Sequence, residues 1–238
     1  MFHSGTLLIF TTLLLGFLLI QGVVKASRNL GKSKQKIKKT RIQVGLVFLG
    51  WLLFVCILGS TDILANFDSM PPRFVIFLGL TVLATLVFAF SKFATLLVEG
   101  LSISYLVGFQ SFRILAELAL YAAYSEGLAP IQMTFLGINH DIFSGVSAPI
   151  MVYIFKHRRS NRMILLWNIL CLLLLMKVVV IAVLSAPTPF RMFMNEPANT
   201  FVAQFPHILL PGILVPFALL GHILVFRWLW RNRKQKVR

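Results

Sequence analysis

Long apolar runs, separated by short polar or basic stretches, dominate the pattern of this chain. An α-helix needs roughly 20 apolar residues to cross about 30 Å of hydrocarbon. The runs are too long and too continuous for barrel strands, and open sheet edges cannot face lipid. The predicted fold class is therefore all-α, a polytopic bundle of seven transmembrane helices. The predicted spans are Ser4–Val24, Ile42–Leu64, Phe74–Ser91, Leu101–Tyr124, Asp141–Phe155, Met163–Ser185 and Ile208–Trp230.

Composition excludes a soluble globular domain. The 238 residues are 58% hydrophobic and only 13% charged, whereas a soluble domain carries about 25% charged residues. The mean hydropathy is +0.86. We expect residues 1–238 to form one transmembrane domain. Cys56 and Cys171 both fall inside apolar runs, so neither a disulfide framework nor a cysteine-based zinc site is expected.

Basic residues predict the orientation of the spans, because Lys and Arg concentrate on the cytoplasmic side. Seven spans place 19 of the 23 basic residues on one side. The N-terminus is then outside and the C-terminus cytoplasmic. The start "MFHSG" has no positive charge, so the first span is expected to be an anchor and not a cleaved signal peptide. The expected connections are a basic cytoplasmic loop at 25–41, a long outer loop at 186–207 and a basic cytoplasmic tail at 231–238.

The net charge of +16 raises the question of a nucleic-acid partner. The basic residues lie in short connections and not in a folded basic domain, which excludes nucleic acid as the expected partner. The expected partners are the lipid bilayer and, at the basic cytoplasmic loops, anionic lipid head groups.

The fourth span, "FQSFRILAELALY", contains a stripe of polar residues. A charge near the bilayer centre costs about 3 kcal/mol or more unless it is paired. Arg113 and Glu117 are four residues apart, so they share a helix face and can form an intrahelical ion pair. Gln110 and Tyr121 continue this face, which we expect to point into the bundle. A structural ion pair and a ligand or proton site remain equally good interpretations.

Polar residues of other spans are predicted at a similar depth, in the outer half of the membrane. They come from the start of span five, from span six and from the segment before span seven. Together they suggest a polar cavity that opens outward beneath the apolar segments 125–139 and 186–207. The candidate ligand-binding residues are Gln110, Arg113, Glu117, Tyr121, His140, Asp141, Lys177 and His207.

Three functions fit these residues. The first is binding or transport of a small ligand or ion, with Arg113 holding an anionic group, Glu117 as its counter-ion and Lys177 assisting. The second is a membrane enzyme or a metal or redox subunit that uses Glu117, His140, Asp141 and His207. The third is a structural or assembly partner. No spacing matches a catalytic or metal-ligand motif, so no catalytic residue, metal ligand or cofactor is assigned. The inner half offers no continuous polar path, which disfavours a channel.

Three segments carry a resemblance to known sequences: "FQSFRILAELALY", "MTFLGINHDIFSG" and "FPHILLPGILVPFALLGH". Over roughly residues 70–228 the chain resembles a group of bacterial seven-span integral membrane proteins to which no function is attached. The resemblance implies a bacterial inner membrane as the location. That group is expected to have a more polar "MTFEGRNFDI"-like segment, from which Leu136, Ile138 and His140 depart.

Overall fold

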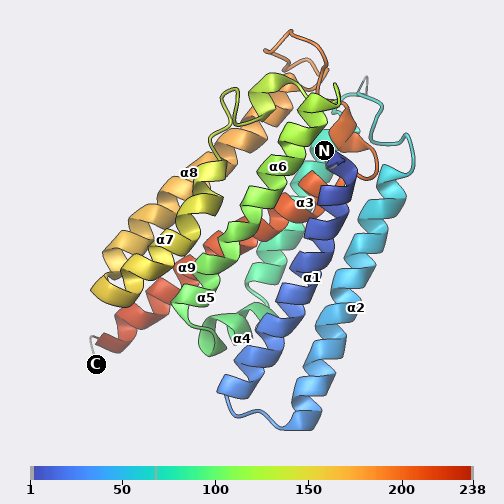
Figure 1. The fold of residues 1–238 in the computed structure, drawn as a ribbon. Helices are drawn as coiled ribbons and strands as arrows, with labels where there is room; N and C mark the ends of the chain where they lie inside the picture. Colours follow the sequence, from blue (N-terminus) through green and yellow to red (C-terminus); the bar gives the residue numbers. More distant parts are fainter. Residues whose placement is uncertain (1–2, 68, 237–238) are drawn as a thin grey trace.

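The computed structural model describes residues 3–67 and 69–236, with side chains as far as residue 233. These residues form helices and no strand (Figure 1), which confirms the all-α fold class. Short 3-10 turns occur at η1 (Phe109–Phe112), η2 (Ile131–Met133) and η3 (Phe201–Ala203), and a π-turn, η4, at Leu210–Leu214. The α-helices are α1 (Ser4–Asn29), α2 (Lys34–Gly59), α3 (Arg73–Ala89), α4 (Lys92–Gly100), α5 (Ile103–Gly108), α6 (Arg113–Ser125), α7 (Ile142–Arg158), α8 (Asn161–Ser185) and α9 (Val215–Lys236).

Five helical segments are long and apolar enough to cross a membrane, which makes this a multi-pass membrane helical protein. They are Ser4–Asn29, Lys34–Gly59, Ile103–Ser125, Asn161–Ser185 and Leu210–Arg233. A sixth is added if α3 and α4, which meet at a 59° bend, count as one span. α7 coincides with the fifth predicted span but has only 17 residues.

The basic segments gather at one end of the bundle, where α1 ends, α2 begins and α9 ends (Figure 1). We call this the basic end, and the opposite end, which carries segment 186–207, the long-loop end. Of the predicted basic loop 25–41, only 30–33 lies outside helices. Gly31 adopts a positive φ of 65° there, a conformation that glycine takes without a steric penalty. The predicted tail continues α9 as far as Lys236, and residues 237–238 lie outside the described residues.

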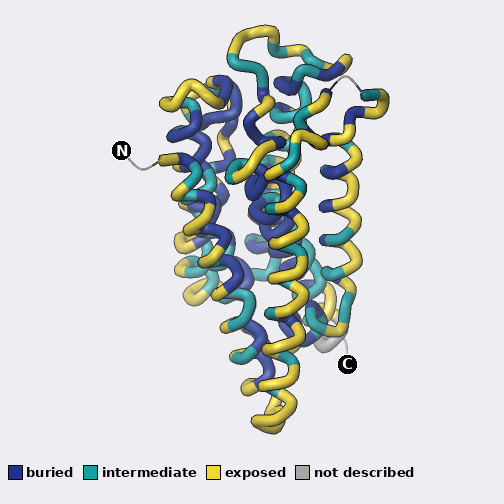
Figure 2. The backbone as a smooth tube through the Cα atoms, turned by 90° about the vertical axis from the view of Figure 1, so that its right-hand side faces the viewer, coloured by how far each residue is buried: buried dark blue, intermediate teal, exposed yellow. Residues whose placement is uncertain are grey.

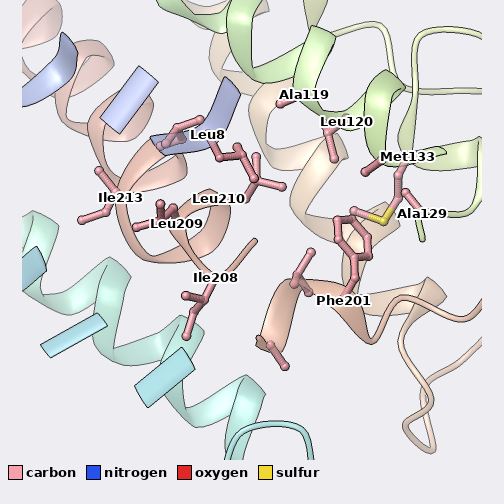
Figure 3. Close-up of a cluster of buried hydrophobic side chains, with 14 of the residues drawn as sticks. Leu8, Ala119, Leu120, Ala129, Met133, Phe201, Ile208, Leu209, Leu210 and Ile213 are labelled. Atoms are coloured by element: carbon pink, nitrogen blue, oxygen red, sulfur yellow. The ribbon is translucent and has the colours of Figure 1, made fainter. Parts of the chain in front are cut away.

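The long connections contribute to the hydrophobic core at the long-loop end. Figure 3 shows Met133 and Phe201, from the two connections, near Leu120 of α6, and all three belong to the same cluster of buried residues as Leu8 of α1. Met133 and Phe201 are only 3% and 6% exposed. Burial over the end of the bundle therefore explains part of the apolar composition of 125–139 and 186–207, whereas Leu136 and Met192 are 56% and 71% exposed. Figure 2 shows the complementary pattern, with exposed positions along the outer faces of the helices.

The start of the last span widens into η4, which contains Pro211. Proline has no backbone N–H and disturbs the hydrogen-bond ladder of a helix. The indole Nε1 of Trp51 on α2 donates to the Gly212 carbonyl at 2.9 Å. A Cβ at Gly212 would lie 2.6 Å from Val55. The backbone of the π-turn at Gly212 therefore packs directly against side chains of α2.

Candidate functional site

Arg113 is the centre of a buried polar network. It follows η1 at the first position of α6 and is 2% exposed. Its Nε donates to Oδ2 of Asp141 at 2.8 Å, and its Nη2 donates to Oδ1 of the same carboxylate. Such a bidentate pair is among the strongest charge-assisted interactions in proteins. Asp141 is the N-cap residue of α7, so the pair joins two helices.

The predicted intrahelical pair of Arg113 with Glu117 was therefore wrong. Side chains on a helix lean toward its N-terminus, so Arg113 extends away from the turn that holds Glu117. The start of α7 lies against that side of α6, because Gly145 leaves no Cβ between the two backbones. A Cβ at Gly145 would be 2.7 Å from the backbone nitrogen of Ile114.

His222 of α9 completes the surroundings of the guanidinium. Arg113 Nη1 lies 3.0 Å from His222 Nε2 and donates to the Cys171 carbonyl at 3.4 Å. His222 Nδ1 lies 2.8 Å from Asn168 Oδ1, while Asn168 Nδ2 donates to the His222 carbonyl at 3.2 Å. The amide oxygen must therefore accept from Nδ1–H, which leaves Nε2 to accept from Arg113. His222 is held as the neutral Nδ1–H tautomer.

Glu117 lies beside this network and is held by Asn139. The Asn139 amide nitrogen is 3.0 and 2.8 Å from the two Glu117 oxygens and 2.9 Å from the Met133 carbonyl. The Asn139 oxygen accepts from the backbone N–H of Asp141 at 2.9 Å. Asn139 thus links the Glu117 carboxylate to the backbone N–H of Asp141.

The network is unbalanced in charge. It contains the carboxyl groups of Glu117 and Asp141 and one guanidinium, and these three residues are 2%, 5% and 2% exposed. His222 is neutral by the tautomer argument. With both carboxylates ionised, the buried group has a formal charge of −1.

Two other candidate residues of the fourth span lie outside the charged group. Gln110 is fully buried and donates from Nε2 to the Ala218 carbonyl at 3.1 Å, which ties η1 to α9. The ring of Tyr121 stacks on Phe135 with 5.2 Å between centroids. The Gln110 hydrogen bond thus joins η1 to α9, and the Tyr121–Phe135 stacking joins α6 to the connection that follows it.

His140 and Lys177 form a separate pair on the surface. Lys177 Nζ lies 3.0 Å from His140 Nδ1, and both residues are exposed. His140 therefore points away from the buried carboxylates, although Asp141 is its neighbour in sequence.

His207 belongs to a third cluster, at the long-loop end. Its Nε2 lies 2.8 Å from the Ser4 hydroxyl, and Glu126 accepts hydrogen bonds from both the backbone N–H and the hydroxyl of Ser4. Burial lowers the pKa of His207, although the charge of Glu126 partly opposes this. Burial acts to raise the pKa of Glu126, but the hydrogen bonds from Ser4, together with the charge and hydrogen bond of His3, outweigh it, and the pKa lies below its usual range.

The structure therefore divides the four residues of the metal or redox hypothesis. Glu117 and Asp141 share the buried network, whereas His140 and His207 have other partners. Among residues 3–67 and 69–236, no group of three or more His, Cys, Asp or Glu side chains could hold a metal ion.

The two cavities of note are apolar. One of about 370 Å³ is lined mainly by α2, α3 and α9, and one of about 40 Å³ lies among α1, α4, α5 and α9. Arg113, Glu117 and Asp141 line neither of them. The charged network is thus packed between helices.

Sequence reasoning missed Asn139, Asn168 and His222 as members of the network. Asn139 lies in the sequence "NHD" shortly before α7, where a polar residue is typical of a helix cap. His222 and Asn168 were visible as isolated polar residues in apolar spans. Their participation depends on how α6, α8 and α9 meet, which no local pattern encodes.

Comparisons of the chain with protein-family models, with curated proteins and with solved structures give no match.

Proposed function

We propose that this membrane protein binds a small monovalent cation, in the simplest case a proton, at the buried carboxyl groups of Glu117 and Asp141. This narrows the small-ligand-or-ion hypothesis to a ligand whose charge matches the network. The observation that carries the proposal is the presence of two buried carboxyl groups around one guanidinium.

The charge balance supports a cation at Glu117. An uncompensated ion in a low-dielectric interior is penalised by several kcal/mol. Asp141 is already neutralised by Arg113, whereas Glu117 has only the amide of Asn139 as a hydrogen-bonding partner among the described residues. A proton or an alkali cation on Glu117 removes the excess charge. Four of the five N–H bonds of Arg113 are directed at protein acceptors, which favours a cationic over an anionic ligand.

A second candidate is a purely structural lock, in line with the assembly hypothesis. The network joins α6, α7, α8 and α9 through hydrogen bonds between buried groups. In this alternative Glu117 keeps one protonation state under all conditions and no cation is exchanged.

Infrared difference spectroscopy of the protein in lipid nanodiscs separates the two. If the proposal holds, a change of pH produces a carboxylic-acid C=O band that disappears in E117Q and persists in E99Q, an exposed carboxylate at the basic end. Vesicles containing the protein and a pH-sensitive dye then test transport, and E117Q should abolish any protein-dependent proton flux.

A band that is unchanged in folded E117Q would overturn proton binding. Thermal unfolding at fixed pH with sodium, potassium or choline chloride tests the alkali-cation form. Stabilisation by sodium or potassium that is absent in E117Q supports it. If the thermal unfolding curves are equal in all three salts and the infrared band is unchanged in E117Q, the purely structural role of the network is the remaining explanation.

We further propose a seven-span topology, with the N-terminus outside and the C-terminus cytoplasmic, in a bacterial inner membrane. The gathering of basic residues at one end of the bundle supports the orientation. Counting α7 and the bent pair α3–α4 as spans brings the number to seven. We also propose that the chain belongs to the bacterial seven-span group, because the three segments "FQSFRILAELALY", "MTFLGINHDIFSG" and "FPHILLPGILVPFALLGH" resemble that group.

A further inference from the structure

The larger cavity lies between two helices that barely touch each other. α2 packs on α1, and α3 packs on α9, so a gap between α2 and α3 is left on the side of the bundle. Its floor includes Val44 and Thr81, which are 1% and 2% exposed. Its rim includes Val47 and Val87, which are 54% and 68% exposed. The cavity therefore opens sideways, on the surface that faces lipid in a membrane protein.

Nearly all contacts that the lining offers to a bound molecule are with hydrocarbon groups. Thr81 and Thr85 donate their hydroxyls to backbone carbonyls of their own helix, at 2.8 and 2.7 Å. Trp51 uses its Nε1–H on the Gly212 carbonyl. Because their polar atoms are already hydrogen-bonded, these three side chains offer only methyl groups and ring faces to a molecule in the cavity. Its volume of about 370 Å³ lies in the range of small-molecule sites.

Positive charge lies at the basic end of the same opening. Arg41 is one helical turn before Val44 on α2, and three- or four-residue spacing keeps residues on one helix face. Lys92 lies between the lining residues Ser91 and Phe93, and it begins α4, whose first N–H groups favour an anion. Arg41 and Lys92 are both exposed, and neither forms an ion pair with another described residue.

We propose that the cavity between α2, α3 and α9 binds one acyl chain of an anionic phospholipid, whose head group is held by Arg41 and Lys92. The apolar floor of the cavity favours a hydrocarbon chain, and the basic residues at its rim favour a negatively charged head group. The site is separate from the carboxylate network and does not depend on the cation-binding proposal.

Native mass spectrometry of the detergent-purified protein tests this inference with defined lipids. Phosphatidylglycerol should bind as one tight equivalent, more strongly than phosphatidylcholine with the same chains. In R41Q/K92Q the preference for phosphatidylglycerol should fall by about twenty-five-fold, because each basic residue near an anionic lipid contributes about fivefold. The matched control K32Q/K156Q removes two basic residues elsewhere at the basic end and should keep the preference.

Blocking the cavity tests the acyl chain. A84F should weaken binding of both lipids, and V47W at the exposed rim provides a second blocking variant that does not disturb the buried floor. An unchanged thermal unfolding midpoint verifies that each variant is folded. Equal affinity for the two lipids, full binding to both folded blocking variants, or the same loss in K32Q/K156Q would each overturn the proposal. Binding of glycerol 3-phosphate as tight as that of the lipid would overturn the role of the cavity.

Discussion

Asp141 neutralises the only guanidinium in the buried network, so its loss should be costly. Breaking a buried ion pair by removing one partner typically destabilises by about 3–5 kcal/mol, because the other charge stays buried. We expect D141N to lower the free energy of unfolding by that amount, measured by unfolding with sodium dodecyl sulfate in mixed micelles. R113M/E117Q/D141L should lose less than D141N, since all three charged groups of the network are then replaced by neutral side chains. Glu196, the partner of Arg191, has a side chain that is 72% exposed. E196Q should therefore cost less than about 1 kcal/mol, and a D141N variant as stable as E196Q would contradict the expectation.

The sequence identified the charged residues of the network better than their partners. Arg113, Glu117 and Asp141 stood out because a charge in an apolar span is expensive. Asn139 and Asn168 did not stand out, because a neutral amide carries a smaller penalty and the residue before a helix is commonly a cap. The pairing of Arg113 with Asp141 depends on the close approach of α6 and α7, which sequence spacing does not reveal.

At the level of helices, Gly145 permits the contact between α6 and α7 on which the ion pair depends. A Cβ at this position would lie 2.7 Å from the backbone nitrogen of Ile114, so the helices must separate in G145A. Overpacking of this kind costs about 1–3 kcal/mol, and we expect that loss in the free energy of unfolding. G79A is the matched control, because a Cβ at Gly79 of α3 meets nothing within 4 Å. It should be neutral or more stable by up to about 1 kcal/mol. Equal effects of the two substitutions would show that the α6–α7 approach is not tight.

The positions of the helices could be predicted from the apolar runs, but their ends could not. Each of the seven runs contains a helix, since backbone polar groups must be satisfied within the segment in lipid. α2, however, begins at Lys34 and not at Ile42. Lysine is a good helix former, so the helix continues beyond the apolar run. Hydropathy reports where lipid is expected and not where helical hydrogen bonding stops. The same difference explains why the predicted loop 25–41 is mostly helical.

Considered as a whole, the long-loop end is held together by the cluster of Ser4, Glu126 and His207, which ties the start of α1 to the end of α6 and to the approach of α9. The folded-state pKa values of His207 and Glu126 both lie below their ordinary values, about 6.5 and 4.3. Each group therefore binds more protons in the unfolded state at acid pH, and the folded protein loses stability as the pH falls.

The loss should begin below about pH 6.5 through His207 and continue below about pH 4.3 through Glu126. We expect the thermal unfolding midpoint to fall between pH 7 and about pH 3. H207Q should flatten the upper part of this dependence, because its side chain cannot take up a proton, and E126Q should flatten the lower part. H140Q is the control, since His140 is exposed and belongs to a different pair. If H207Q and H140Q followed the wild-type curve alike, the cluster would not be the acid-sensitive tie of the long-loop end. The fall in stability would then have to come from other groups, and comparison with E117Q would show whether the buried network is among them.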